Sequence, residues 1–139
     1  MSTLQYLSQA HFSHKTVLVR CDLNLPVHDG EVLDTARIKI LRPTIDWLLK
    51  RHCKIILLSH FKNPTQEDPR YSMRQFIPHL EKIFGHTVAF FDPHKDNPIV
   101  LCENLRFHPG EKHNDLAFAK TLAETGEQKR RKRQIVQIF

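Results

Sequence analysis

Residues 54–60 read Lys-Ile-Ile-Leu-Leu-Ser-His, an apolar run that ends in two polar residues. A short apolar run of this kind predicts a buried strand over Lys54–Leu58. An equivalent run, Thr-Val-Leu-Val, predicts an earlier strand at Thr16–Val19. Further along the chain, Thr87–Phe91 and Ile99–Leu101 are expected to form two more strands. The sequence therefore predicts a sheet of at least four short strands.

A helix is expected between the first two strands. Its apolar residues recur at helical spacing and mark one face, namely Ile38, Leu41, Ile45 and Leu48. Asp34 precedes this pattern and is a suitable N-cap residue. Pro43 lies inside the pattern and is expected to kink or divide the helix, because proline has no backbone N–H to donate.

A second helix is expected after Lys54–Leu58. Ser72 and Gln75, three positions apart, have the spacing of a capping box at a helix start. The apolar face that follows consists of Met73, Phe76, Ile77, Leu80, Ile83 and Phe84. Pro78 predicts another kink. Gly85 is suited to the left-handed position that ends a helix.

A last helix is expected to begin at Asn114 or Asp115 and to run through Leu122. Strands and helices thus alternate along most of the chain. This order predicts an α/β fold with an open, mostly parallel sheet and helices on both faces. We assign residues 1–123 to this domain. Residues 124–139 are expected to form a basic tail outside it.

The net charge of +6 at pH 7 arises mainly in that tail, because five basic residues are consecutive at Lys129–Arg133. A charge run of this kind is typical of a solvated segment. It contains no aromatic residue that would stack on bases. Nucleic-acid binding through this run is therefore the weakest of the functions we consider.

The three cysteines are Cys21, Cys53 and Cys102, an odd number at wide spacing. They predict no disulfide framework and favour a reducing, cytoplasmic location. No Cys-x-x-Cys or His-x-x-x-His spacing occurs among the cysteines and histidines. No apolar run reaches the roughly 20 residues of a membrane helix. We expect neither a metal site nor contact with a membrane.

Polar side chains follow the expected strands, where open α/β sheets bind their ligands. They are Asp22, Asn24, Ser59, His60, Asn104 and Arg106, with Arg37 in the first turn of a helix. Arginine forks and hydrogen-bonding groups suit a small anion that carries phosphate, carboxylate and hydroxyl groups. Spacing alone leaves other roles open. Asp22 can close an Asx turn, His60 can be structural, and arginines are common on protein surfaces.

Four motifs in order are similar to those of the phosphoglycerate kinase family. Residues 19–26, Val-Arg-Cys-Asp-Leu-Asn-Leu-Pro, resemble the family's Arg-Val-Asp-Phe-Asn-Val-Pro, and residues 34–38, Asp-Thr-Ala-Arg-Ile, resemble its Asp-x-x-Arg-Ile. Residues 56–60, Ile-Leu-Leu-Ser-His, resemble its Leu-x-Ser-His. Residues 101–107, Leu-Cys-Glu-Asn-Leu-Arg-Phe, resemble its Leu-Glu-Asn-Leu-Arg-Phe. The resemblance extends over residues 15–123 and covers roughly the first third of a typical member.

The resemblance implies a glycolytic kinase of two α/β domains that is usually monomeric. The N-terminal domain binds 3-phosphoglycerate or 1,3-bisphosphoglycerate, and the C-terminal domain binds the magnesium complex of ADP or ATP. The implied substrate-binding positions are Asp22, Asn24, Arg37, His60, Asn63 and Arg106. Arg37 matches the catalytic arginine, whose fixed charge stabilises the transferring phosphoryl group. No cofactor is expected on this chain, because the nucleotide belongs to the other domain.

Three departures from the family pattern are visible. The family's Ser-His-Leu-Gly-Arg-Pro reads Ser-His-Phe-Lys-Asn-Pro at residues 59–64, so Asn63 stands where the family has a substrate arginine. Lys62 would restore that charge only as a point charge on a different side-chain direction. Residues 92–98 are too few for the helix that the family usually carries there. The resemblance ends near Ala123, and we hypothesise that a shifted reading frame or an early stop produced the tail.

The chain has only four glycines, and they form no Gly-rich nucleotide loop. We therefore expect a kinase by family whose isolated 139-residue chain has no turnover. Two alternatives stay open beside this interpretation. One is a module that binds an anionic metabolite without chemistry, and the other is a remnant without function.

Overall fold

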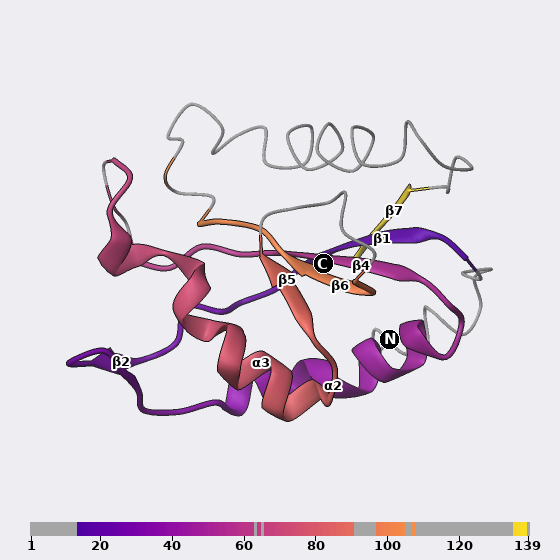
Figure 1. The fold of residues 1–139 in the computed structure, drawn as a ribbon, viewed down its shortest axis with the longest axis horizontal. Helices are drawn as coiled ribbons and strands as arrows, with labels where there is room; N and C mark the ends of the chain where they lie inside the picture. The colour runs from indigo at the N-terminus through magenta and orange to yellow at the C-terminus, as the bar shows by residue number, and fades with distance from the viewer. Residues whose placement is uncertain are drawn as a thin grey trace.

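The computed structural model describes residues 14–62, 64, 66–90, 97–104, 107 and 135–138, the last four through their backbone. Five strands in these ranges form one sheet in the order β5-β6-β4-β1-β7, and every pairing is parallel (Figure 1). The strands are β1 (Thr16–Arg20), β4 (Lys54–Leu58), β5 (Val88–Phe90), β6 (Ile99–Leu101) and β7 (Ile135–Ile138). The predicted α/β class with a mostly parallel sheet is confirmed.

The four predicted strands are present with nearly the expected bounds. β4 and β6 begin and end where the apolar runs do. β1 extends one residue further, to Arg20, and β5 is shorter than expected. Because β5 and β6 pair in parallel although only residues 91–98 connect them, this crossover is shorter than the dozen or more residues that parallel strands usually need.

Both faces of the sheet are apolar. Alternate residues point to opposite faces, so Val17 and Ile55 belong to one buried cluster while Leu18 and Ile56 belong to another. Strands that are apolar on both sides are typical of a buried parallel sheet. The two described α-helices lie on the same side of the sheet, against the Val17 cluster (Figure 1).

The helix after β1 is α2 (Ala36–Leu49), which buries Ile38, Ile45 and Leu48 as the spacing predicted. Its N-cap is Thr35, one residue later than expected, and the Thr35 side chain makes no capping bond. The Asp34 carboxylate instead accepts a hydrogen bond of 2.8 Å from the backbone N–H of Ala36. α2 runs through Pro43 without being divided there.

The second helical segment differs from the prediction at its start. It first forms a 3₁₀ turn, η2 (Met73–Phe76), and only then α3 (Ile77–Phe84). The Ser72 hydroxyl accepts from the N–H of Arg74 at 3.2 Å, as a cap does. Gln75 Nε2, however, donates to the Ser72 carbonyl at 2.8 Å, so the reciprocal bond of a capping box is not formed.

Pro78 lies in the first turn of α3, where the missing N–H has no helical partner to lose. The change from the 3₁₀ turn to the α-helix lies just before Pro78, and the kink stays a prediction. Gly85 adopts a left-handed conformation, with φ of 73°, and ends α3 as predicted.

The stretch after β1 contains a small antiparallel hairpin that the sequence analysis did not predict. Its strands are β2 (Val27–His28) and β3 (Glu31–Val32). Asp29 and Gly30 between them both have positive φ, of 50° and 79°, as a type I′ hairpin turn requires. The Asp-Gly pair is the sequence signal that would have identified it.

Several expectations fall outside the described residues. These are the helix from Asn114 or Asp115 through Leu122, the Lys129–Arg133 run, and the side chains of Asn63 and Arg106. The division at residue 123 stays a prediction. Within the segment assigned to the tail, Ile135–Ile138 form β7, which pairs with β1 in the register Thr16 with Ile135.

Candidate functional site

The carboxyl ends of three adjacent strands define the candidate site. β1, β4 and β6 are parallel neighbours, so the residues that follow Arg20, Leu58 and Leu101 emerge at one edge of the sheet. The backbone ties these exits together, because Cys21 N–H donates to the Leu58 carbonyl at 2.9 Å. This is the edge at which open α/β sheets bind their ligands.

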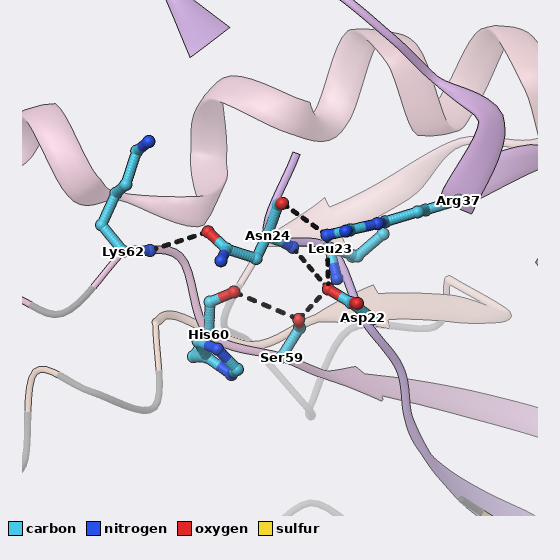
Figure 2. Close-up of polar contacts among 7 residues, drawn as sticks. All are labelled: Asp22, Leu23, Asn24, Arg37, Ser59, His60 and Lys62. Atoms are coloured by element: carbon cyan, nitrogen blue, oxygen red, sulfur yellow. Dashed lines mark hydrogen bonds and ion pairs between the residues drawn. The ribbon is translucent and has the colours of Figure 1, made fainter. Parts of the chain in front are cut away.

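Asp22, Asn24 and Arg37 form one polar cluster at this edge (Figure 2). Arg37 Nη1 lies 3.1 Å from Asp22 Oδ1 and donates to the Asn24 carbonyl at 2.7 Å. The Asn24 N–H also donates to Asp22 Oδ1, at 3.1 Å. The Asx-turn role left open for Asp22 is therefore present alongside the ion pair.

This ion pair is exposed to solvent. The Arg37 side chain is 48% exposed and that of Asp22 is 62% exposed. An exposed pair of this kind adds at most about 1 kcal/mol to stability. Its geometry matters more for function, since a guanidinium held in place offers its remaining N–H groups to an anion.

The loop after β4 holds the loop after β1 at two points. Ser59 Oγ accepts from the Leu23 N–H at 2.9 Å and donates to the His60 carbonyl at 3.3 Å. The Lys62 N–H donates to Asn24 Oδ1 at 3.0 Å. Figure 2 shows both links, and in that view the imidazole of His60 points away from the Arg37 guanidinium.

The residues after β6 form the framework beneath. Asn104 Nδ2 donates to the carbonyls of Phe61 and Tyr71, at 2.7 and 2.9 Å. The Glu103 carboxylate accepts from the Ser72 hydroxyl and from the N–H of Met73, both at 2.8 Å. Glu103 therefore holds the start of η2 in place, and the Asn104 side chain holds the loop after β4.

Sequence reasoning grouped Ser59 and Asn104 with the groups open to a ligand. The structure buries both, with 2% and 1% of their surface exposed. They hold backbone atoms of neighbouring loops, so they shape the site from below. Asp22, Asn24 and Arg37 are brought together as predicted, with His60 in the adjoining loop, whereas Asn63 and Arg106 lie outside the described residues.

Lys62 has a left-handed backbone, with φ of 58°. It occupies the position at which the family motif has glycine, the one residue that adopts this conformation without steric cost. Its side chain is exposed, and Nζ lies 5.5 Å from the centre of the Phe61 ring. The Lys62 ammonium is drawn pointing away from Asp22 and Arg37 (Figure 2).

We predict that Lys62→Gly raises the free energy of unfolding by about 0.5–1 kcal/mol, because it removes the left-handed strain but adds some chain entropy to the unfolded state. Thermal or urea unfolding measures the change. The reverse control is Gly85→Ala, where φ is 73° and an added Cβ meets nothing within 4 Å, so the variant loses stability through backbone strain alone. A Lys62→Gly variant that is less stable than the parent would contradict the prediction.

Two thiols near the strand ends have raised pKa values. Burial raises the pKa of the Cys102 thiol to about 12. Burial, aided by the negative charge of Asp22, also raises the pKa of Cys21 to about 12. Thiolate is the reactive form, so neither group is suited to act as a nucleophile.

We predict that stability falls between pH 9 and pH 12, partly because of Cys102. The unfolded chain loses the thiol proton near pH 9, whereas the folded chain keeps it until about pH 12. The unfolded state then binds fewer protons, so the free energy of unfolding decreases by up to about 1.4 kcal/mol per pH unit. Urea unfolding at pH 8, 9.5 and 10.5 tests this. In Cys102→Ala the free energy of unfolding should decrease less per pH unit than in the parent. An equal decrease in the two proteins would contradict the prediction.

No group of three or more histidine, cysteine, aspartate or glutamate side chains within the described ranges has the arrangement of a metal site. None of the described helices is both long and apolar enough to span a membrane. A cavity of about 610 Å³ lies beside η1 (Pro69–Tyr71) and η2, and its lining includes Glu67, Asp68 and Glu103. The lining also includes Arg74, so three carboxylates face one guanidinium and negative charge predominates there.

Comparison with known proteins agrees with the motifs. The sequence model of the family described as "Phosphoglycerate kinase" matches residues 7–128, which extends beyond the expected limit at residue 123. The curated phosphoglycerate kinase of Bartonella quintana is 39% identical over 134 residues, covering 87% of this chain and 34% of the relative. That of Rhodospirillum centenum is 41% identical over 126 residues, covering 81% of this chain and 32% of the relative.

Solved structures show the same likeness. The phosphoglycerate kinase from Coxiella burnetii superposes with a TM-score of 0.71 at 28% identity, over 85% of this chain and 32% of that chain. The enzyme from Pyrococcus horikoshii gives a TM-score of 0.67 at 27% identity. The chain spans about a third of the length of the relatives that it matches. With four motifs, the likeness to solved structures and a family match over most of its residues in agreement, this chain belongs to the phosphoglycerate kinase family.

Proposed function

We propose that this chain is the phosphoglycerate-binding part of a phosphoglycerate kinase, which transfers a phosphoryl group between 1,3-bisphosphoglycerate and ADP. The observation that carries the proposal is the cluster of Arg37, Asp22 and Asn24 at the carboxyl ends of parallel strands. A fixed cation beside an acceptor and an amide suits a ligand that combines anionic and hydroxyl groups. The family match supports the same ligand class.

Each group has a distinct proposed role. Arg37 uses Nη1 for Asp22 and for the Asn24 carbonyl, which leaves the rest of the guanidinium to face a phosphate or carboxylate. As phosphoryl transfer spreads negative charge over the equatorial oxygens, this cation stabilises the transition state. The Asp22 carboxylate accepts a hydrogen bond from a substrate hydroxyl and repels phosphate. His60, Asn63 and Arg106 complete the proposed set, with Asn63 contributing no charge.

The nucleotide is proposed to bind elsewhere, as the magnesium complex of ADP or ATP. The chain spans about a third of its relatives, and we assign none of its residues to the nucleotide or the metal. Its three cysteines are free, which fits the reducing cytoplasm that we propose as its location. A monomer with no membrane partner completes the proposal.

Calorimetry on the full 139-residue chain tests the ligand. We expect 3-phosphoglycerate to bind at least tenfold more tightly than glycerate, which lacks the phosphate, because a charged hydrogen bond contributes about 1.5–3 kcal/mol. Affinity no better than that of inorganic phosphate would overturn the proposal.

A coupled assay separates catalysis from binding. We expect the purified chain to form no ATP from 1,3-bisphosphoglycerate and ADP, because the ADP is proposed to bind outside this chain. Binding of 3-phosphoglycerate without turnover would identify a binding module of kinase descent. Turnover by the 139-residue chain would show that it binds nucleotide after all.

A further inference from the structure

Asn104 is a buried amide at the end of β6, with 1% of its surface exposed. Its Nδ2 group donates to the Phe61 carbonyl at 2.7 Å and to the Tyr71 carbonyl at 2.9 Å. A side chain this deeply buried cannot contact a ligand in solution. Its effect on the site must therefore pass through the backbone groups that it holds.

One of those groups leads directly to the site. The Phe61 carbonyl and the Lys62 N–H belong to the same peptide unit, which is planar and trans, so the two point in opposite directions. The carbonyl accepts from Asn104 Nδ2, and the N–H donates to Asn24 Oδ1 at 3.0 Å. A single rigid peptide is thus held between two asparagine side chains, one buried and one at the site.

The same peptide is strained. Lys62 has φ of 58°, which costs a non-glycine residue about 1–2 kcal/mol. Rotation of the 61–62 peptide plane would relieve this strain, but it would break the hydrogen bonds at both ends. The bond from Asn104 therefore opposes the conformational preference of Lys62.

The orientation of the peptide decides which atoms Asn24 shows to a ligand. Because the Lys62 N–H can only donate, the atom that faces it must be the Asn24 oxygen. The amide hydrogens of Asn24 Nδ2 are then directed elsewhere, as donors. The backbone carbonyl of Asn24 meanwhile accepts a hydrogen bond from Arg37 Nη1 at 2.7 Å. The position of Asn24 therefore also affects the Arg37 guanidinium.

We propose that Asn104 is a positioning residue that fixes the 61–62 peptide and thereby turns the Asn24 carboxamide to donate to the ligand. The ligand part of this inference rests on the proposed phosphoglycerate function. The geometric part does not, since it concerns hydrogen bonds within the free protein.

The geometric part is tested by NMR of the ¹⁵N-labelled full chain without ligand. In the parent, the exposed Lys62 amide should exchange with solvent more than tenfold more slowly than in an unstructured chain. In Asn104→Ala this protection should be lost, and the Lys62 amide and Asn24 side-chain resonances should shift. Random-coil exchange at Lys62 in the parent, or unmoved resonances in Asn104→Ala, would overturn the inference.

The ligand part is tested by calorimetry with 3-phosphoglycerate. Asn104→Ala should weaken binding roughly tenfold, the equivalent of one good hydrogen bond. Lys62→Gly removes the strain that drives the peptide to rotate, so the double variant should bind more tightly than Asn104→Ala alone. If Asn104→Ala alone does not fold, the test compares Lys62→Gly with the double variant, because Lys62→Gly stabilises the fold. Equal affinities for the parent and Asn104→Ala, or for Asn104→Ala and the double variant, would overturn the inference.

A matched core variant excludes a general loss of stability as the cause. Leu48 is fully buried near the C-terminal end of α2, beside the amino end of β4, and Leu48→Ala should destabilise the fold without moving the Lys62 resonance. If Leu48→Ala shifts Lys62 and weakens binding as much as Asn104→Ala, the positioning role is wrong. If the parent binds no 3-phosphoglycerate but Asn104→Ala still shifts Lys62, the proposed function fails while the geometric inference stands.

Discussion

Arg37→Ala is expected to weaken binding of 3-phosphoglycerate by about 10- to 100-fold, because a hydrogen bond to a charged partner contributes about 1.5–3 kcal/mol. The variant removes the cation of the site and leaves the Asp22 carboxylate without its ion-pair partner. That unpaired carboxylate then repels the anionic ligand, which adds to the loss. Stability should change by no more than about 1 kcal/mol, since both side chains are exposed.

Arg42→Ala is the matched control for Arg37→Ala. Arg42 lies on the same helix, is exposed, and pairs with Asp46 at 3.6 Å one helical turn away. Both variants remove one positive charge, so a general electrostatic effect would weaken binding equally. Calorimetry should find a large loss for Arg37→Ala and little change for Arg42→Ala. Equal losses of affinity in the two variants would show that Arg37 does not bind the ligand.

Phe76→Ala is expected to lower the free energy of unfolding by about 3–5 kcal/mol. Phe76 is fully buried, and its ring packs edge-on against Phe61 with the centroids 5.1 Å apart. Truncation loses the transfer free energy of the ring and leaves a cavity between η2 and the loop after β4. Urea unfolding followed by circular dichroism measures the loss.

Ile40→Ala provides the control for this core substitution. Ile40 is an apolar residue of α2 that is 74% exposed, so its truncation should change stability by less than about 0.5 kcal/mol. A loss for Phe76→Ala as small as that for Ile40→Ala would mean that Phe76 is not part of the packed core.

The sequence was most informative where one physical effect dominated. Lys54–Leu58 and Ile99–Leu101 are apolar on both faces, and no competing pattern fits a run that short, so these strands were predicted to the residue. Gly85 was predicted because a left-handed residue was needed at the end of a helix and glycine has no Cβ.

The prediction was wrong where two local solutions differ by little. A Ser-x-x-Gln spacing is compatible with a capping box and with the observed bond from Gln75 to the Ser72 carbonyl. Here the carboxylate of Glu103, a residue distant in sequence, accepts hydrogen bonds from the Ser72 hydroxyl and the Met73 N–H. These two bonds favour the 3₁₀ turn. No local pattern contains that contact.

The site was predicted in the same uneven way. Arg37 and Asp22 were grouped from their motifs and lie in contact. The burial of Ser59 and Asn104 could not be derived, because the sequence does not reveal which neighbouring loop each side chain meets. The sequence analysis treated Lys62 only as a substitute charge. Its place at the motif's glycine was the one signal that could have indicated strain at the 61–62 peptide.

The most direct measurement is NMR mapping of the labelled full chain during titration with 3-phosphoglycerate. We predict that the largest shifts fall on the residues after β1 and β4, with Asp22, Asn24 and Arg37 affected together and Arg42 unmoved. Shifts confined to other surfaces, or no shifts at millimolar ligand, would show that these strand ends do not hold the phosphorylated acid.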